Sequence, residues 1–360
     1  MMQLLIFILT LSALVLVHEL GHFLVAKFFG MRVEEFGIGL PPRMKKLFVS
    51  GGTVFSLNWL PIGGFVKLFG EDMENAEQAG STEAFFNKPI WQRAGVLLAG
   101  VTMNFLLAVV LFGAVYSYMG IPTKTDQVMI VEIIKGSPAE IAGIEKGSVA
   151  KKIIFEGKEY SFGMMDEFVE VVNGLKGKEV VLVTEKVGVM KEFSLVPREN
   201  PPAGEGALGV ALSNIEMKKY PWWQMPFRGV KVGMEEAVAW GREIVKNLYV
   251  LLAGIVTGKG VPKDIAGPVG IYQVSKEVFK FGWLAILQFA GVLSVNLAIL
   301  NVMPFPALDG GRVVFLGIEK IIGKRLKNRI EGYVHTAGMV FLLGLMVLIT
   351  VRDILKLLGA

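Results

Sequence analysis

The sequence predicts a polytopic α-helical membrane protein with four transmembrane helices, a membrane-associated β-hairpin and one inserted α+β domain. Of the 360 residues, 53% are hydrophobic, which is high for a soluble protein. Four apolar runs, at about 3–29, 94–119, 281–303 and 334–351, are long enough to span a bilayer. A further stretch, 125–214, is rich in Lys and Glu and contains short alternating runs, which indicates one small soluble domain.

The composition excludes several classes of function. The chain has no cysteine, so disulfides, thiolate zinc ligands and thiol catalysis are excluded. The net charge is only +5 and no basic run interleaves with aromatic residues, so we expect no nucleic acid partner. We divide the chain into an N-terminal membrane part (1–124), the soluble domain (125–214), an amphipathic membrane-associated segment (215–280) and a C-terminal membrane part (281–360).

The first span carries the strongest chemical signal. His18 and His22 are four residues apart, so both imidazoles lie on one helix face and can bind one metal ion. Glu19 could activate water there as a general base. Such a string also arises by chance, but chance would leave these polar side chains unpartnered, and an acid at bilayer depth costs about 2.5 to 3.5 kcal/mol. We expect this segment to be retained in the mature protein.

The sequence pattern of residues 53–67 predicts the membrane-associated β-hairpin. Thr53–Leu60 alternates between apolar and polar side chains, and we expect Gly63 and Gly64 to form the turn. The hydrophobicity of this segment suggests that it dips toward the membrane, where protein or a water-filled cavity must cover its backbone. We expect the 53–60 strand to offer an edge to an extended substrate peptide.

The second and third spans each carry polar or small residues. The second span contains Gly95, Gly100 and Asn104. Small residues suit close helix packing, and an amide can form a polar bond across helices. Plain packing accounts for the glycines equally well. The third span ends just after Asn301, where Pro304 and Pro306 break the helix.

The soluble domain is predicted to mix strands and helices. Ser137 and Pro138 are placed to cap and begin a short helix. We expect strands at Val128–Ile134, Lys152–Phe155, Val180–Glu185 and Lys191–Val196, and a helix at Met165–Leu175. After it, Trp222 and Trp223 suit a membrane interface, and charges at helical spacing over 231–248 predict an amphipathic helix on the membrane or against the helix bundle. A loop at 258–270 should follow, with its turn at Gly267–Gly270.

The orientation follows from the basic residues near the span ends. Segments 30–92 and 304–333 carry Lys and Arg densely, so both should be cytoplasmic. Both termini and the 125–214 domain should then lie outside.

Two histidines alone do not complete a catalytic zinc site, which usually has three protein ligands and a water. His335 begins the fourth span and could be the third ligand, but a capping or snorkelling role suits it better. Asp309 is the better candidate, because it follows a broken helix on the same expected side as His18 and His22. The alternative is that Asp309 binds no metal and only caps the next helix.

Taken together, His18-Glu-Leu-Gly-His22 and Asn301-Val-Met-Pro-Phe-Pro-Ala-Leu-Asp-Gly310 resemble the signature pair of the site-2 protease family of intramembrane zinc metalloproteases. The bacterial regulator of sigma-E protease type is the best match. Weaker matches follow in the same chain order, at Pro61–Lys67, Ala99–Asn104 and Gly267–Ile271.

The resemblance implies a zinc endopeptidase of the bacterial inner membrane that cuts transmembrane segments of pre-cleaved, single-span membrane proteins. It assigns zinc binding to His18, His22 and Asp309, and the general base to Glu19. It also assigns substrate contacts to Asn301, Asn104, Gly63 and Gly64. Anti-sigma factors and leftover signal peptides are both open as substrates, and the oligomeric state is open as well.

Residues 125–214 resemble a PDZ domain through Gly136-Ser-Pro-Ala and their helix-strand order. In the family's circularly permuted version, the peptide-binding loop would be at Leu208, Gly209 and Val210. The segment Gly147–Ala150 departs from the family pattern, which leaves peptide binding open. Two other functions remain as alternatives: a peptide-binding membrane signalling protein with a vestigial metal site, and a metal transporter.

Overall fold

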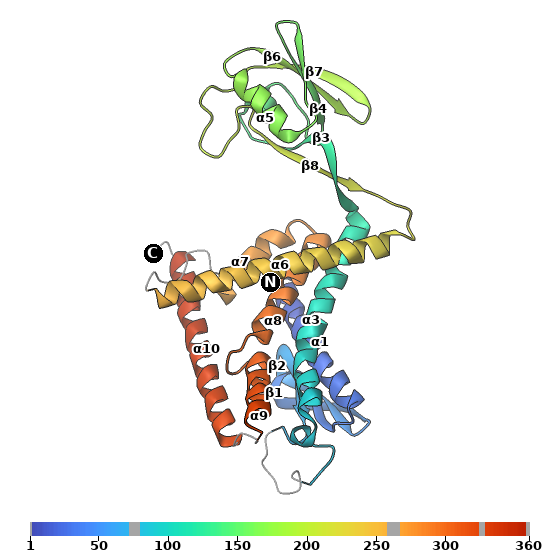
Figure 1. Ribbon diagram of the computed structural model, residues 1–360, viewed down its shortest axis with the longest axis vertical. Helices are drawn as coiled ribbons and strands as arrows, with labels where there is room; N and C mark the ends of the chain where they lie inside the picture. The colour runs from blue at the N-terminus through green and yellow to red at the C-terminus, as the bar shows by residue number, and fades with distance from the viewer. Residues whose placement is uncertain (1, 72–79, 258–266, 324–327, 358–360) are drawn as a thin grey trace. The chain divides into compact units, whose positions relative to one another are not determined.

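The computed structural model describes residues 2–71, 80–257, 267–323 and 328–357. The chain forms two compact units, a membrane unit (Met1–Tyr118 and Trp222–Ala360) and an inserted unit (Met119–Pro221), which are described separately (Figure 1). The inserted unit is wider than the expected 125–214. Its first strand β3 (Ile121–Ile133) and last strand β8 (Val210–Lys218) pair as far as Ile121 and Lys218, which adds residues at both ends.

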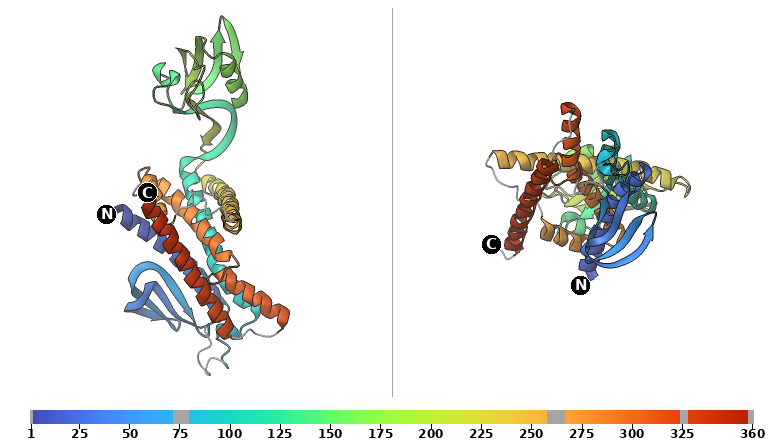
Figure 2. Two further views of the ribbon diagram at one scale, coloured as in Figure 1. Left: turned by 90° about the vertical axis from the view of Figure 1, so that its left-hand side faces the viewer. Right: turned by 90° about the horizontal axis from the view of Figure 1, so that it is seen from below.

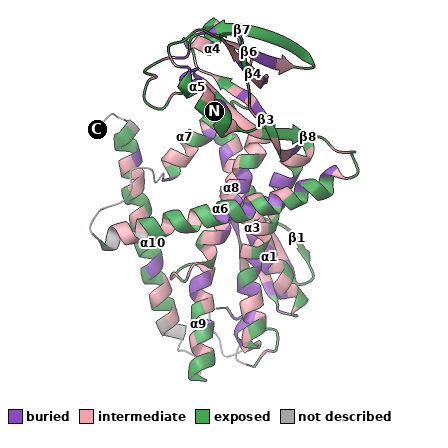
Figure 3. Ribbon diagram, turned by 45° about the horizontal axis from the view of Figure 1, so that its top comes forward, coloured by how far each residue is buried: buried purple, intermediate pink, exposed green. Residues whose placement is uncertain are grey.

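Among the described residues, four helices of the membrane unit are long and apolar enough to cross a membrane, as predicted. They are α1 (Met2–Phe28), α3 (Ile90–Met119), α8 (Trp283–Val302) and α10 (Asn328–Leu357). The first turn of α1 and the last turn of α10 lie at the same end of the unit (Figure 2). Most of the described part of helix α10 is exposed or partly exposed (Figure 3). Its apolar residues Val340, Phe341 and Val347 are more than half exposed. Exposing this apolar surface to water would be unfavourable, whereas lipid tails are as apolar as the side chains themselves.

Helix α8 ends where the sequence predicts. Pro304 lacks an N–H group, and Met303 before it takes an extended backbone with φ −62° and ψ 142°. The chain turns through Ala307, which has a φ of 77°, and α9 (Asp309–Ile322) begins directly afterwards. This turn places Asp309 at the start of a new helix.

The β-hairpin exists, but its predicted turn is wrong. Strands β1 (Val33–Ser50) and β2 (Thr53–Leu68) are joined at Gly51 and Gly52, which have φ angles of 52° and 77°. Positive φ at both central residues suits a two-residue hairpin turn, and glycine adopts it without strain. Gly63 and Gly64 lie inside β2 instead.

The long hairpin is also folded back on itself. Residues 35–38 of β1 pair with 54–57 on one side and with 64–67 on the other, while 45–49 pair with the far side of 54–57. The expected edge at 53–60 is therefore wrong for residues 54–57, because these are paired on both sides. In the described register the outer segments are 45–49 and 64–67. Before α3, the chain makes a short 3-10 helix, η1 (Phe85–Asn87).

The predicted amphipathic helix is α6 (Met225–Val256), which packs against α8 and crosses α3. The crossing with α3 is close because it is lined by glycines. A Cβ added to Gly233 would lie 2.5 Å from the Val109 carbonyl oxygen, and one added to Gly229 would lie 2.5 Å from the Gly113 carbonyl oxygen. Residues 258–266 of the expected loop lie outside the described residues. Gly267 caps α7 (Pro268–Phe279), so 268–270 begin a helix rather than form a turn.

The inserted unit is a six-stranded sheet with two helices. The strand order is β7-β6-β4-β3-β8, and β5 pairs with β4. The remaining elements are α4 (Pro138–Ile141), β4 (Val149–Phe155), β5 (Lys158–Ser161), α5 (Met165–Gly174), β6 (Val180–Lys186) and β7 (Val189–Leu195). Ser137 caps α4 as predicted, because its side chain accepts a hydrogen bond from the Glu140 N–H. Strands β5 and β8 were not predicted.

Candidate metal centre

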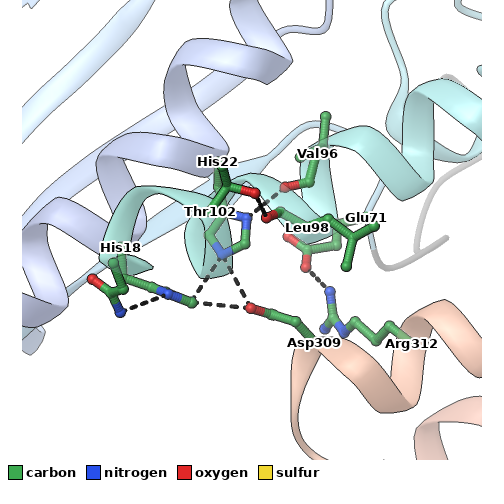
Figure 4. A network of polar contacts seen from close by, with 9 residues as sticks. His18, His22, Glu71, Val96, Leu98, Thr102, Asp309 and Arg312 are labelled. Atoms are coloured by element: carbon green, nitrogen blue, oxygen red, sulfur yellow. Dashed lines mark hydrogen bonds and ion pairs between the residues drawn. The ribbon is translucent and has the colours of Figure 1, made fainter. Parts of the chain in front are cut away.

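Three buried or half-buried polar side chains meet inside the membrane unit. The Nε2 atoms of His18 and His22, both on α1, are 3.1 Å apart. Asp309 Oδ2, at the start of α9, lies 3.0 Å from His18 Nε2 and 3.3 Å from His22 Nε2. Figure 4 shows the three side chains pointing toward one another. The structure thus brings together two residues of the first helix and one that follows the third apolar span.

The imidazoles have room because α1 and α3 approach each other closely. A Cβ added to Gly21 of α1 would lie 2.5 Å from the Ala99 carbonyl oxygen of α3. A Cβ added to Gly100 of α3 would lie 2.5 Å from His22 Nε2 and 2.6 Å from His18 Cε1. The space that a side chain at position 100 would fill is therefore occupied by the two rings.

Helix α3 also provides a polar partner for each imidazole. His22 Nδ1 lies 2.8 Å from the Val96 carbonyl oxygen, which accepts its proton and leaves Nε2 free of one. His18 Nδ1 lies 3.3 Å from the Asn104 side-chain nitrogen. The Val96 contact thereby leaves His22 Nε2 available as a ligand, and the Nε2 atoms of both histidines are the ring nitrogens nearest Asp309.

Two ion pairs hold the helix that carries Asp309. Arg312, one turn after Asp309 on α9, pairs with Glu71 (Figure 4). Glu319, further along α9, pairs with buried Arg93 of α3 at 2.9 Å. Breaking a buried pair costs about 3–5 kcal/mol, because the remaining charge is left uncompensated. We infer that the buried Arg93–Glu319 pair fixes α9 relative to α3, and that the Arg312–Glu71 pair ties the start of α9, near the Asp309 carboxylate, to the segment after β2.

The three side chains fit a zinc ion. His18, His22 and Asp309 are the group of potential metal ligands found among the described residues, with ligand atoms within 4.8 Å of one another. Tetrahedral zinc with bonds of about 2.1 Å separates its ligand atoms by about 3.4 Å, close to the spacings seen here. Two imidazoles and one carboxylate are a common catalytic set that leaves a fourth position open. His335, the alternative third ligand, does not belong to this group, and its Nδ1 accepts a hydrogen bond from the Ala307 N–H at 2.9 Å.

The other predicted residues are spread around this centre. Glu19 is half-buried and interacts electrostatically with both histidines and Asp309. Asn301 is half-buried near the end of α8. Gly63 and Gly64 pack against α1, where a Cβ added to Gly64 would lie 2.7 Å from the Leu16 side chain.

The sequence analysis singled out Gly100 and Asn104 but missed Val96 and the face that the three residues share. Val96, Gly100 and Asn104 are spaced by four residues on α3, so this periodicity could have indicated one stripe facing the histidines. No local sequence pattern indicated the pairing of Glu71 with Arg312. The candidate peptide-binding residues belong to the inserted unit, where Leu208 is buried, Gly209 has a φ of 69° and Val210 begins β8.

Two buried histidines and a half-buried aspartate, with Glu19 beside them and apolar helices around them, are the donor set expected of a zinc metalloprotease in a membrane. Comparison with known proteins agrees. The sequence profile of peptidase family M50, the site-2 proteases, matches residues 6–345, and the chain belongs to this family. The cofactor is zinc.

Similar proteins extend over nearly the whole chain. A Clostridium acetobutylicum protein named "putative zinc metalloprotease" is 33% identical over 352 residues, which cover 96% of each chain. The zinc metalloprotease RasP of Oceanobacillus iheyensis is 28% identical and covers 98% of each chain. RasP of Geobacillus kaustophilus is 29% identical and covers 97% of each. These relatives and the four apolar helices identify a membrane-bound metalloprotease.

Proposed function

We propose that this metalloprotease cleaves peptide bonds within transmembrane segments of single-span membrane proteins that an earlier cut has shortened. The observation that carries the proposal is the position of the ligands. His18 and His22 lie beyond the middle of an apolar, 27-residue helix, and both are buried. A substrate must therefore reach the site within the bilayer. Anti-sigma factors and leftover signal peptides are the two substrate classes that we propose.

The residues have complementary roles in this reaction. A zinc ion on His18, His22 and Asp309 would polarise the scissile carbonyl and acidify a water molecule. Glu19 takes the proton of the attacking water and later delivers it to the leaving amine. General acid–base help of this kind contributes roughly 10²–10⁴ in rate. Asn301, Asn104, Gly63 and Gly64 are proposed to contact the unwound substrate backbone.

Substrate unwinding is part of the proposal. A transmembrane helix keeps its peptide groups in internal hydrogen bonds, so the scissile bond is exposed only after local unwinding. Residues that weaken a helix near the cleavage position should therefore speed cleavage. We propose that the hairpin dips into the membrane and holds the unwound peptide as an added strand, as other peptide-binding sheets do. Its exposed apolar residues Leu47, Phe48, Trp59 and Leu60 support the first part.

The first prediction compares Glu19→Gln with Asp309→Ala in purified full-length protein reconstituted into vesicles with a single-span substrate. Glu19→Gln should retain zinc and lose at least about 10² in cleavage rate, since the amide keeps the volume but cannot act as a base. Asp309→Ala should lose both zinc and cleavage, because two histidines do not complete the site. Metal content is measured by atomic emission, and cleavage by mass spectrometry of the products.

Either of two outcomes would contradict this assignment. Near-normal cleavage by Glu19→Gln would exclude Glu19 as the base. Full zinc content in Asp309→Ala would exclude Asp309 as the third ligand. Cleavage that occurs only in detergent-exposed loops, and never within the spanning segment, would contradict the proposed intramembrane substrate.

We further propose that the protein lies in the bacterial inner membrane with the inserted unit on the outer side. The dense basic residues of segments 30–92 and 304–333 support this orientation, because such residues favour the cytoplasmic side. We propose that the inserted unit is a PDZ domain that receives a peptide along β8. Strand β8 ends the described strand order, and α5 lies near it, which supports a peptide groove there.

A further inference from the structure

Asn104 of α3 is a buried amide with an incomplete set of hydrogen bonds. Its side chain is 0% exposed, and its Oδ1 has no hydrogen-bond partner among the described residues. Its Nδ2 lies 3.3 Å from His18 Nδ1. An unpaired buried polar atom costs about 1–3 kcal/mol, so we expect a specific physical reason for it.

The protons of the two histidines provide that reason. Both Nε2 atoms lie nearest to Asp309, so zinc is bound through Nε2 and the ring proton of each histidine is then on Nδ1. The proton of His22 is accepted by the Val96 carbonyl oxygen at 2.8 Å. The proton of His18 also needs an acceptor, and an amide nitrogen cannot be one.

A half-turn of the Asn104 side chain supplies the acceptor that His18 needs. Rotating the carboxamide by about 180° exchanges its oxygen and nitrogen, which have nearly the same size and shape. The oxygen then faces His18 Nδ1 and accepts its proton, and the nitrogen takes the former place of the oxygen. We propose that Asn104 is a positioning residue, whose side-chain oxygen holds the His18 imidazole in the tautomer and orientation that bind zinc.

The surroundings of Asn104 suit this role. Val96, Gly100 and Asn104 follow one another at intervals of four along α3, so they form one stripe against the two imidazoles. The backbone oxygen of Asn104 accepts a hydrogen bond from the Ser294 hydroxyl of α8 at 2.7 Å. Asn104 is thus held from α8 while its side chain faces α1. Partners of zinc-binding histidines typically contribute 10–100-fold to metal affinity.

The inference concerns the zinc site alone, so it can fail without affecting the proposed cleavage within the membrane. It competes with the role that the family resemblance gives Asn104, which is contact with the substrate. A substrate contact changes KM and leaves zinc affinity unaltered in the absence of substrate. A partner of His18 changes zinc affinity whether or not substrate is present.

The test measures zinc affinity of the full-length protein in detergent, by competition with a fluorescent chelator and without substrate. Asn104→Leu keeps the branched shape but has no acceptor, and it should weaken zinc binding 10–100-fold. Asn104→Asp supplies an acceptor at the same place and should stay within a few-fold of the wild type. Ser294→Ala is the matched control, because it removes the hydrogen bond to the Asn104 backbone oxygen and leaves the Asn104 side chain beside His18. It should leave affinity unchanged.

Cobalt(II) provides a second readout, since its visible absorption reports the geometry of the ligands. Asn104→Leu should alter the cobalt spectrum, whereas Asn104→Asp and Ser294→Ala should keep its band positions. Wild-type zinc affinity in Asn104→Leu would overturn the inference, as would an equally weak Asn104→Asp. If Asn104→Leu does not fold, Asn104→Ala takes its place with the same expected weakening, and unchanged zinc affinity in that variant overturns the inference equally.

Discussion

His335 has a different role from the one that its residue type suggests. Histidine is a common zinc ligand, and this one begins an apolar span, so the sequence left it open as a third ligand. In the structure its Nδ1 accepts a hydrogen bond from Ala307, a non-glycine residue with a φ of 77°. Such a backbone costs about 1–3 kcal/mol and persists only where its surroundings hold it. Asp309 follows two residues later, so we infer that His335 steadies the turn that delivers the third ligand.

The second prediction tests this role with an isosteric pair. Asn places a side-chain oxygen close to the position of the histidine Nδ1, so His335→Asn should keep zinc affinity within a few-fold. His335→Leu lacks the acceptor and should weaken zinc binding several-fold. Ala307→Gly in the same chain should restore part of the loss, because glycine adopts this φ without strain. Zinc competition on purified protein measures all three.

Thr336→Ala is the control for His335, since the Thr336 hydroxyl donates to the Gly332 carbonyl oxygen within α10. It should bind zinc like the wild type. A His335→Asn variant as weak as His335→Leu would show that the hydrogen bond to Ala307 does not steady the turn.

The site residues divide into those that local sequence reveals and those that it does not. His18, Glu19 and His22 are visible because ionisable residues at this spacing on an apolar helix indicate a metal site. Asp309 is visible because prolines end the helix before it. The contacts of Val96 and Gly100 depend on how closely α1 and α3 cross, and no local pattern encodes that distance.

At the scale of elements, hydropathy and prolines predicted the spans and the end of α8, but not the β-pairing. The Gly51-Gly52 turn and the Gly63-Gly64 pair look alike in sequence, so the choice between them needed the register. Strand β8 was missed because its only described neighbour in the sheet, β3, is far away in sequence. The glycines at 229 and 233 show the small-residue spacing of close helix crossings, and their partner Gly113 is equally distant.

The third prediction concerns the edge of the hairpin. Residues 64–67 are an outer segment of the described sheet, and Gly63 and Gly64 at its start pack on α1 at Val15 and Leu16, one turn before His18. We expect this edge to pair with the unwound substrate. Proline removes one main-chain donor, so a proline scan over Phe65–Lys67 should slow cleavage at the position whose N–H faces outward, without loss of folding.

Two further scans serve as controls for the edge. Prolines at 54–57 should destabilise the hairpin, because that segment is paired on both sides. Prolines at 45–47, in the other outer segment, should leave cleavage unchanged. The edge would be excluded as the substrate-pairing strand if prolines in the two outer segments had equal effects on cleavage. It would also be excluded if no proline in 65–67 slowed cleavage. Cleavage rate and thermal unfolding are measured for every variant.

The fourth prediction concerns acid stability of the inserted unit. Hydrogen bonds and charge attraction from Lys186 and Lys191 lower the pKa of Glu145 to about 2. An unfolded Glu titrates near 4.3, so the folded unit gains stability from this group above that pH and loses it as the pH falls toward 2. Glu145→Gln should lower protection of the unit against hydrogen exchange at pH 7. The difference from wild type should shrink below about pH 4.

Glu192→Gln, a change on β7 outside this cluster, is the control for the removal of one negative charge. A difference between wild type and Glu145→Gln that is the same at pH 7 and pH 3 would show that the two lysines do not stabilise the unit through Glu145.

At the scale of the whole molecule, the three candidate zinc ligands and Glu19 belong to the membrane unit, and the inserted unit interrupts that unit between α3 and α6. The inserted unit therefore supplies neither a ligand nor the proposed base. We propose that it limits the size of the substrates that reach the zinc.

The fifth prediction is that replacing residues 125–214 with a flexible linker keeps zinc and the cleavage of a shortened substrate. The same variant should also cleave substrates that still carry a bulky outer domain, which the full chain should reject. Loss of cleavage of the shortened substrate, in a protein that is folded and holds zinc, would contradict the size filter.

The sidedness needed for this filter is tested separately. Val187 is 95% exposed and the chain has no cysteine, so Val187→Cys gives a single site for a membrane-impermeant thiol reagent. Labelling should occur from outside in intact cells. Labelling only after the reagent is given access to the cytoplasm would place the inserted unit on the cytoplasmic side and contradict the proposed orientation.

The separation of the proposed ligands along the chain has a consequence for biosynthesis. His22 leaves the ribosome about 290 residues before Asp309. At roughly 5–20 residues per second, Asp309 follows His22 by roughly 15–60 s. We expect the nascent chain to hold two histidines without a partner carboxylate during that interval, so it should not yet bind zinc firmly. Proteolytic activity should therefore begin only after the segment that carries Asp309 has been inserted.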